Sequence, residues 1–277
     1  MGFAQPANMT EPTALAVARN RAAVMAELRR LMPRMGEQRK ALPFGLAAID
    51  SHLPDGGLAC GALHEIVPAS ESCIAAAFGF IAAILGRLAY PLVFVMPAYG
   101  LRPYRPHGRL HGHGLNALGL DPGRLILVET THRKETLWAM EEAVRSAAPA
   151  AVAGVIDTLD LKLSQRLHLA ATEAGVPLFL LRAAPPTLPS PASGGGWGGG
   201  SAAATRWRIG TAAAARDRFG LVTRPRWHLQ LERCRNGRPG QWVVEYDHVA
   251  HRFSLAAALA DFSRARGAGE KSIKQAS

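Results

Sequence analysis

Short apolar runs alternate with helix-like segments through the middle of the chain, and this alternation limits the fold more than any other feature of the sequence. The strand-like runs are 63–67, 92–96, 125–129, 152–157 and 176–182. The helix-like segments between them are 71–88, 134–147 and 161–174. Strands that alternate with helices form parallel sheets whose two faces are covered. We therefore expect an α/β sandwich with a mostly parallel central sheet.

The segment before this core has the pattern of one amphipathic helix. Apolar residues recur at helical spacing from Leu15 to Met32, Thr10 is a candidate N-cap, and Pro33 follows the last turn. Such a stripe is typical of a helix that packs against a core or a neighbour. We expect an N-terminal helical segment over 1–40.

The end of the core has the pattern of an antiparallel hairpin. The runs 227–234 and 242–246 are separated by the turn-forming sequence RNGRPG. We expect this hairpin to close the sheet, so that the core extends over 41–255. The remaining residues, 256–277, are expected to form a C-terminal helix and a frayed charged tail.

One internal segment, 184–204, interrupts the alternation. Four prolines are followed by six glycines around Trp197. This composition buries too little apolar surface to offset the entropy lost on ordering. We therefore expect a flexible loop inside the core.

The basic charge of the chain is concentrated in one stretch. The 32 Lys and Arg outnumber the 21 Asp and Glu, which gives a net charge of +11. Between positions 201 and 240, nine arginines face only Asp217 and Glu232, so nine minus two, or +7, lies there. Aromatic residues interleave with these arginines, which favours a surface for DNA or an acidic partner over a merely solvated face. The candidate residues are Arg206, Trp207, Arg208, Arg216, Arg218, Arg224, Arg226, Arg235 and Arg238.

The cysteines and the apolar segments predict a cytoplasmic protein. Cys60, Cys73 and Cys234 are far apart and lack CxxC spacing, so they indicate neither a disulfide framework nor a zinc site. The most apolar stretch, 73–85, is shorter than the roughly 20 residues that cross a bilayer, and no signal-peptide pattern precedes it. We expect no membrane partner.

Three histidines in one loop could suggest a metal site. His107, His111 and His113 lie among Arg102, Arg105 and Arg109, with no nearby carboxylate or thiolate to complete a ligand set. Because the arginines would repel a cation, we expect no metal and interpret the loop as a surface that contacts phosphates.

The turn after the first core strand is where a parallel α/β sheet holds a phosphate. A P-loop needs glycines for close backbone approach, a lysine for the β and γ oxygens, and a Ser or Thr for magnesium. Here Pro68 and Cys73 stand at the glycine positions, Ile74 at the lysine position and Ala75 at the hydroxyl position. We expect no ATP hydrolysis and no cofactor.

The residue types leave open that this is an ordinary strand-to-helix turn. Ser70, Ser72 and Cys73 could also suggest a nucleophile, but no G-x-S-x-G elbow surrounds them. We interpret these three residues as helix caps.

The residues around this turn resemble the entry to the RecA core. The match is carried by Ile49, Asp50, Leu53, Gly56, Gly57, Leu58, Gly61, Glu65 and Ile66. The run VAGVID looks like the second acidic motif of that family, with Asp157 at the position that helps to hold magnesium. Without the lysine and the hydroxyl, Asp157 is not expected to keep that role.

Three later features extend the resemblance. The run LERCRNGRPGQWVVEY is similar to the late RecA-family hairpin, through Arg233, Arg235, Gly237 and Gly240. The loop 184–204 falls where RecA carries its second DNA-binding loop. Met96 and Pro97 replace the glutamate that activates water in RecA-type ATPases.

From about residue 40 to residue 255, these features together resemble the ImuA family of the bacterial inducible mutagenesis cassette. The resemblance implies a RecA-like, non-catalytic accessory protein of DNA-damage-induced (SOS) translesion synthesis. The implied partners are ImuB, which is a Y-family polymerase-like protein, an error-prone polymerase III α subunit, and also RecA and single-stranded DNA. It implies a cytoplasmic protein that associates with the nucleoid when DNA is damaged. Two alternatives remain open: a SulA-type division inhibitor and a RecA-like protein that still binds ATP.

Overall fold

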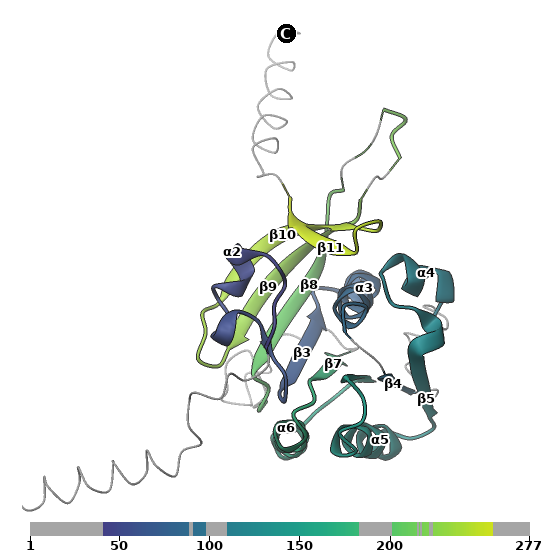
Figure 1. Cartoon of the computed structure of the whole chain (residues 1–277), viewed down its shortest axis with the longest axis vertical. Helices are drawn as coiled ribbons and strands as arrows, with labels where there is room; N and C mark the ends of the chain where they lie inside the picture. Colours follow the sequence, from purple (N-terminus) through teal and green to yellow (C-terminus); the bar gives the residue numbers. More distant parts are fainter. Residues whose placement is uncertain are drawn as a thin grey trace, which may run out of the picture. The chain divides into compact units, whose positions relative to one another are not determined.

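A mostly parallel sheet forms the centre of the structure (Figure 1). The computed structural model describes residues 41–88, 91–97, 110–182, 201–214, 216, 218–221 and 224–256. The strands of the large sheet are β3 (Leu63–Pro68), β4 (Leu92–Pro97), β5 (Leu125–Thr130), β6 (Ala151–Ile156), β7 (Leu178–Arg182), β8 (Thr205–Ala212), β9 (Arg226–Cys234), β10 (Gly240–Asp247) and β11 (Arg252–Leu255).

Within the described residues, nine strands follow one another in the order β11-β10-β9-β8-β3-β7-β6-β4-β5. The strands from β8 to β5 in this order are parallel to one another. The last three strands of the chain add to β8 in antiparallel orientation. A separate small sheet pairs β1 (Ala41–Leu42) with β2 (Leu58–Ala59). The chain therefore has the α/β class of fold that the sequence predicts.

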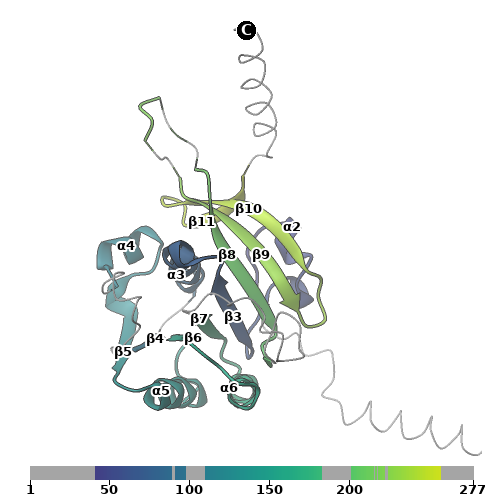
Figure 2. The ribbon, with the colours of Figure 1, turned by 180° about the vertical axis from the view of Figure 1, so that it is seen from behind.

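Helices cover both faces of the parallel strands (Figure 2). The helix α3 (Ile74–Leu85) packs on one face, and α5 (Arg133–Arg145) and α6 (Leu161–Ala174) pack together on the other. The short elements α2 (Ala47–Asp50) and α4 (Gly112–Ala117) lie on the α3 side. The remaining turns are the 3-10 helices η1 (Pro54–Gly56), η2 (Glu71–Cys73) and η4 (Pro122–Arg124).

The helix α3 is apolar around nearly its whole circumference, because it lies between the sheet and the segments packed outside it. Ten of its twelve residues are buried. Two glycines let other parts of the chain lie close to this helix. If Gly86 carried a side chain, its Cβ would lie 2.6 Å from the backbone carbon of Gly119, and a Cβ on Gly79 would lie 3.1 Å from the ring of Trp227. A helix that is hydrophobic on all sides is a core helix, as the sequence predicts for this segment.

An aromatic cluster fills the space between α3 and the antiparallel strands. Its ring centroids lie 5.3 to 6.1 Å apart, at the distances of favourable aromatic pairs. Burial raises the pKa of the Tyr246 hydroxyl to about 12, and this hydroxyl donates a hydrogen bond of 2.7 Å to the carbonyl oxygen of Leu118. The cluster consists of Phe44, Phe80, Trp207, Trp227, Tyr246 and Phe253.

A buried histidine joins this cluster to the central strand. His64 is fully buried, with Nδ1 2.8 Å from the hydroxyl of Thr205 and Nε2 2.9 Å from the carbonyl oxygen of Ala59. The indole of Trp207 donates to the same Thr205 hydroxyl over 3.0 Å. The hydroxyl therefore donates to Nδ1, and the neutral imidazole donates from Nε2 to Ala59. Every polar atom of this chain of bonds is satisfied only while His64 is neutral.

The element bounds expected from the sequence agree with most helices and strands of the structure to within a few residues. The prediction for α6 is confirmed at both ends, whereas the predicted helix 71–88 begins as the 3-10 turn η2 and ends at Leu85. The hairpin is confirmed as β9 and β10, although it extends the sheet through β8 rather than closing it. The predicted N-terminal helix, residues 184–200 of the predicted flexible loop and the predicted C-terminal helix lie outside the described residues. The prediction of a flexible loop is wrong for its last residues, 201–204, because Ala202 and Ala203 are buried and the backbone N–H of Ala202 donates to the hydroxyl of Ser164 over 3.0 Å.

Four strands were missed. The strand β8 alternates Arg206 and Arg208 with the buried Trp207 and Ile209, a period of two that is typical of a strand with one buried face. The sequence placed these residues beside a loop instead. The short strands β1, β2 and β11 have too few residues to show a pattern. Within the described ranges, no helix is both long and apolar enough to cross a membrane.

The environment of His64 predicts a loss of stability in acid. Burial lowers the pKa of this imidazole from 6.5 to about 4, with a smaller contribution from His168. The unfolded chain therefore takes up a proton at a higher pH than the folded chain, so the stabilisation is complete above pH 6.5 and is lost as the pH falls toward 4. Between pH 7.5 and pH 5, we expect this one group to remove about 2 kcal/mol from the free energy of unfolding.

Urea unfolding at both pH values, compared with a His64→Gln variant, measures this contribution. The wild type should lose about 2 kcal/mol more than the variant over the interval. Equal losses in the two proteins would contradict the assignment of the acid sensitivity to His64.

Candidate functional site

The turn between β3 and α3 lies at the carboxyl edge of the parallel strands, where α/β sheets bind ligands. The turn is held to β8, because the backbone N–H of Ala69 donates to the carbonyl oxygen of Ile209 over 2.7 Å. The hydroxyl of Ser70 lies 2.8 Å from that of Ser72 and donates to the sulfur of Cys73 over 3.2 Å. Ser70 and Cys73 occupy the N-cap positions of η2 and α3, but neither helix has a side-chain cap, so the prediction of capping by the side chains of Ser70, Ser72 and Cys73 is wrong.

The hydroxyls turn toward one another and toward the Cys73 thiol instead of toward the backbone. Burial raises the pKa of this thiol, but hydrogen bonds from Ser70, Thr211 and Ser72 outweigh that effect, so the pKa lies below its ordinary value. This turn gathers hydroxyls and one thiol at the place where a nucleotide-binding protein presents glycines and a lysine.

The side chain at the lysine position faces the core. Ile74 is 2% exposed and packs in the cluster of α3, whereas Ala75 is exposed and Pro68 is buried at the end of β3. A lysine in the place of Ile74 would lie in an apolar environment, where an unpaired ammonium is strongly unfavourable. The backbone at this position therefore does not direct a cationic side chain at a phosphate above the turn.

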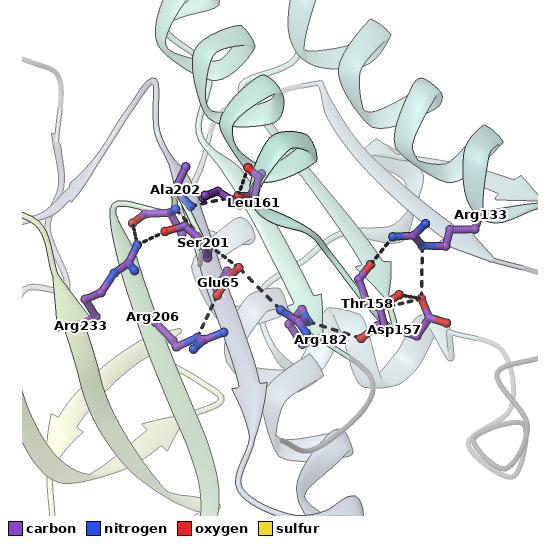
Figure 3. Close-up of polar contacts among 12 residues, drawn as sticks. Glu65, Arg133, Asp157, Thr158, Leu161, Arg182, Ser201, Ala202, Arg206 and Arg233 are labelled. Carbon is purple, nitrogen blue, oxygen red and sulfur yellow. Dashed lines mark hydrogen bonds and ion pairs between the residues drawn. The ribbon is translucent and has the colours of Figure 1, made fainter. Parts of the chain in front are cut away.

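Asp157, at the position of the second acidic motif, already has a cation beside it. The Nε atom of Arg133 lies 3.7 Å from Oδ1 of Asp157, and Nη2 of Arg133 donates to the carbonyl oxygen of Thr158 over 2.9 Å (Figure 3). The backbone N–H of Thr158 donates to the same carboxylate oxygen over 2.6 Å. A magnesium ion at this carboxylate would lie next to a guanidinium that repels it.

A second cluster surrounds Glu65 in the middle of β3. Its carboxylate is fully buried and accepts hydrogen bonds from Nε of Arg206 at 2.9 Å and from the hydroxyl of Ser201 at 2.6 Å. Nη1 of Arg182 lies 3.9 Å away. Arg182 also donates from Nε to the carbonyl oxygen of Asp157 over 3.4 Å, so its guanidinium lies between the two clusters (Figure 3).

Glu65 holds together segments that are distant in the sequence. Arg182 is the last residue of β7, Ser201 precedes β8, and Arg206 lies within β8. Sequence reasoning used Glu65 only as part of a family resemblance and did not single out Arg182. The signal was a charged residue within the buried run LHEIVP, because a carboxylate in such a strand requires an internal cation.

The basic stretch contains several arginines that are already paired with carboxylates. Arg208 pairs with Glu232, and Arg226 pairs with Glu245. Arg224 pairs with Asp247 over 3.0 Å, and Arg206 pairs with Glu65 as described above. Three of these four acids lie outside positions 201–240, so charge counted along the sequence overstates the charge that the surface presents.

The remaining arginines lie at two opposite edges of the sheet. Arg235 donates to the carbonyl oxygen of Ala202 over 3.2 Å, and Arg238 donates to that of Ser51 over 3.3 Å, both from the turn between β9 and β10. Arg216 and Arg218 lie in the connection between β8 and β9, at the carboxyl edge. The eight residues of β8 separate the two groups by about 26 Å at roughly 3.3 Å per residue. The candidate residues therefore do not form one patch.

Trp207 is not part of any such surface. It is 1% exposed, because alternate residues of β8 face opposite sides of the sheet and Trp207 faces the aromatic cluster. The prediction that Trp207 contacts DNA or a partner is therefore wrong. Trp227, another aromatic residue of the basic stretch, is 5% exposed on the same side.

The described residues contain no group of three or more His, Cys, Asp or Glu side chains that could hold a metal ion. The ring of His111 accepts a hydrogen bond of 3.4 Å from the backbone N–H of Gly114 at the start of α4 and lies 5.4 Å from the ring of His113. His107 lies outside the described residues.

The Glu65 cluster predicts a specific effect on stability. Glu65→Gln keeps the size of the side chain but removes the charge that faces Arg206 and Arg182. We expect a loss of about 3 kcal/mol in the free energy of unfolding, at the lower end of the range for broken buried pairs because both guanidinium groups keep some contact with solvent. Urea denaturation measures the loss. Glu142→Gln, which changes an exposed glutamate of α5, is the matched control and should change stability by less than about 0.5 kcal/mol; equal stabilities for the two variants would contradict the assignment.

Comparison with known proteins adds the family. No family model matches the chain. The chain is similar to Protein ImuA from two strains of Caulobacter vibrioides, each 34% identical over 237 residues. The alignment covers 79% of this chain and 90% of each relative. On this similarity, the chain belongs to the ImuA family.

Proposed function

We propose that the protein is a non-catalytic accessory factor in DNA-damage-induced translesion synthesis and mutagenesis. Membership of the ImuA family supports a role in the mutagenesis system that contains ImuA and ImuB. The partners that we propose are ImuB and an error-prone polymerase III α subunit, with RecA and single-stranded DNA as further partners. The proposed place of action is the cytoplasm, at the nucleoid when DNA is damaged.

The observation that carries the non-catalytic part of this proposal is the burial of Ile74. Phosphoryl transfer requires positive charge at the β and γ oxygens and a bound magnesium ion. Ile74, 2% exposed, occupies the lysine position, and the carboxylate of Asp157 faces the guanidinium of Arg133. At the two positions where a RecA-type ATPase holds the triphosphate and magnesium, this edge of the sheet has a buried aliphatic side chain and a carboxylate beside a guanidinium.

DNA contact is supported by the arginines that keep exposed guanidinium groups at the edges of the sheet. Arg216, Arg218, Arg235 and Arg238 are exposed, and none of them forms an ion pair with a carboxylate of the described residues. Each guanidinium has five donors, so the backbone contacts that they make leave donors available for phosphate oxygens.

A genetic experiment tests the proposed role. Deletion of the gene should lower the frequency of rifampicin-resistant mutants after ultraviolet irradiation, and the wild-type gene should restore it. Asp157→Asn keeps the size of the side chain but removes the carboxylate charge at the position of the second acidic motif. Because the proposed role uses no nucleotide chemistry, the Asp157→Asn gene should restore the mutation frequency as fully as the wild type does.

The contradicting outcome is an Asp157→Asn strain that behaves like the deletion while the variant accumulates to the normal level. Overexpression in undamaged cells distinguishes the proposed accessory factor from a division inhibitor. An accessory factor for translesion synthesis should leave cell length unchanged, whereas a division inhibitor should produce filaments.

A further inference from the structure

Three exposed arginines, Arg233, Arg235 and Arg238, lie close together in the chain at the turn between β9 and β10. The structure describes every residue from 224 to 256, so the whole turn is seen. The strand β9 runs antiparallel to β8 and ends where β8 begins, with Cys234 opposite Thr205. The turn therefore lies at the amino edge of the parallel strands, away from the turn between β3 and α3 (Figure 2).

Backbone carbonyl groups hold the first two of these guanidinium groups. Nη2 of Arg233 donates to the carbonyl oxygen of Ser201 and, over 2.7 Å, to that of Ala203 (Figure 3). Nη2 of Arg235 donates to the carbonyl oxygen of Ala202 over 3.2 Å. Because the two arginines bind the carbonyl groups of three consecutive residues, their positive charges are held close to one another.

The rest of the turn is fixed on the segment that follows α2. The backbone N–H of Arg238 donates to the carbonyl oxygen of His52 over 2.9 Å, and Nη2 of Arg238 donates to that of Ser51 over 3.3 Å. Asn236 has a left-handed φ of 60°, and a Cβ on Gly237 would overlap the carbonyl oxygen of His52. A turn that is already fixed loses little conformational entropy when it binds a ligand.

No acid of the described residues forms an ion pair with any of the three arginines. Glu232, which directly precedes Arg233, pairs with Arg208. The carboxylate of Asp50 accepts hydrogen bonds from three backbone N–H groups. The segment 183–200 contains no Asp or Glu. Since a carbonyl oxygen is a neutral acceptor, the turn keeps three positive charges that no ion pair neutralises.

The surroundings of these charges favour a phosphate chain over a protein partner. Among the described residues, the large apolar side chains that are exposed all lie outside the turn and outside the segments 51–52 and 201–204 that it contacts. Protein interfaces usually have an apolar or aromatic centre. A nucleic-acid backbone is bound through charge and hydrogen bonds to phosphate oxygens, and each guanidinium has five donors, of which the carbonyl contacts use only some.

We propose that Arg233, Arg235 and Arg238 form a binding site for the phosphate backbone of single-stranded DNA at the amino edge of the sheet. The site contacts phosphates and not bases, so its contribution to binding is independent of the base sequence. This inference rests on the proposed function, because it gives the proposed DNA contact a location and a mode of binding.

Equilibrium binding of the full chain to two labelled strands tests the proposal. One is a mixed-sequence oligonucleotide of about 20 nucleotides, and the other is an abasic strand with the same number of phosphates. Arg235→Gln with Arg238→Gln should weaken binding to both strands by the same factor, roughly 20-fold at about 0.1 M salt. The slope of log Kd against log salt should fall by about 1.4. Arg233 is left unchanged because it supports the backbone of 201–203.

A charge-conserving variant separates the loss of charge from a disturbance of the turn. Arg235→Lys with Arg238→Lys keeps both positive charges and a donor for each carbonyl group. This variant should keep the salt slope of the wild type.

A matched control removes two charges that are already paired. Arg124 and Arg145 have side chains that are 54% and 53% exposed, and they pair with Asp121 and Glu141. Arg124→Gln with Arg145→Gln lowers the net charge of the chain as much as the turn variant does, but it should leave the salt slope for both strands unchanged. Circular dichroism should show that every variant is folded.

Four results would overturn the proposal. Equal binding by the Arg235→Gln, Arg238→Gln variant and the wild type would place the DNA contact elsewhere, and a loss confined to the mixed-sequence strand would exclude a phosphate contact. An equal loss in the matched control would show a general effect of net charge. A turn variant that loses binding to labelled polyglutamate but keeps binding to DNA would assign the turn to an acidic protein.

These results can be distinguished from a failure of the proposed function. A wild-type chain that restores mutagenesis in cells but binds neither strand would overturn the turn as a DNA site while the accessory role stands. A chain that shows the predicted binding, but whose deletion leaves mutagenesis unchanged, would overturn the accessory role while the site stands.

Discussion

The packing of α3 against the sheet is the constraint on which the rest of the structure depends. This helix is buried along ten of its twelve residues, so its first residue, Ile74, points into the core and not toward the edge where a phosphate would lie. The turn before it presents Ser70, Glu71 and Ser72, and the hydroxyl of Ser70 contacts that of Ser72 and the buried Cys73 thiol. At the position where a P-loop would carry its lysine, this chain has a side chain that completes the hydrophobic core.

Internal ion pairs balance the acids in this part of the sheet. Arg133 lies beside Asp157, and Arg206 and Arg182 lie beside the buried Glu65 (Figure 3). Arg182 reaches both clusters, so the centre of the carboxyl edge is organised by the protein's own guanidinium groups. Arginines that pair with internal acids add little charge to the surface. The exposed arginines that remain form two separate basic regions at opposite edges of the sheet, and one of these regions carries the exposed ring of Phe219.

The sequence predicted the architecture well and the surface poorly, for physical reasons. Parallel strands buried on both faces are continuous apolar runs, such as those of β6 and β7, and they are recognisable without long-range information. The charge partners of Arg208, Arg224 and Arg226 depend on strand register, which a linear count of charges does not contain. Trp207 was assigned to a surface because its arginine neighbours were read as a cluster, whereas the period of two in β8 places it on the opposite face from them. The turn between β3 and α3 lies where the sequence predicts a strand-to-helix turn, but the bonding of its serines to Cys73 depends on local geometry that residue types do not contain.

Equilibrium dialysis of the full chain against labelled ATP, with and without magnesium, is the most direct test of the proposal that this protein holds no nucleotide. With an isoleucine buried where the phosphates need a cation, we expect no saturable binding up to millimolar ATP and no effect of magnesium. Saturable binding in the micromolar range, strengthened by magnesium and weakened by Asp157→Asn, would contradict a non-catalytic role for this fold.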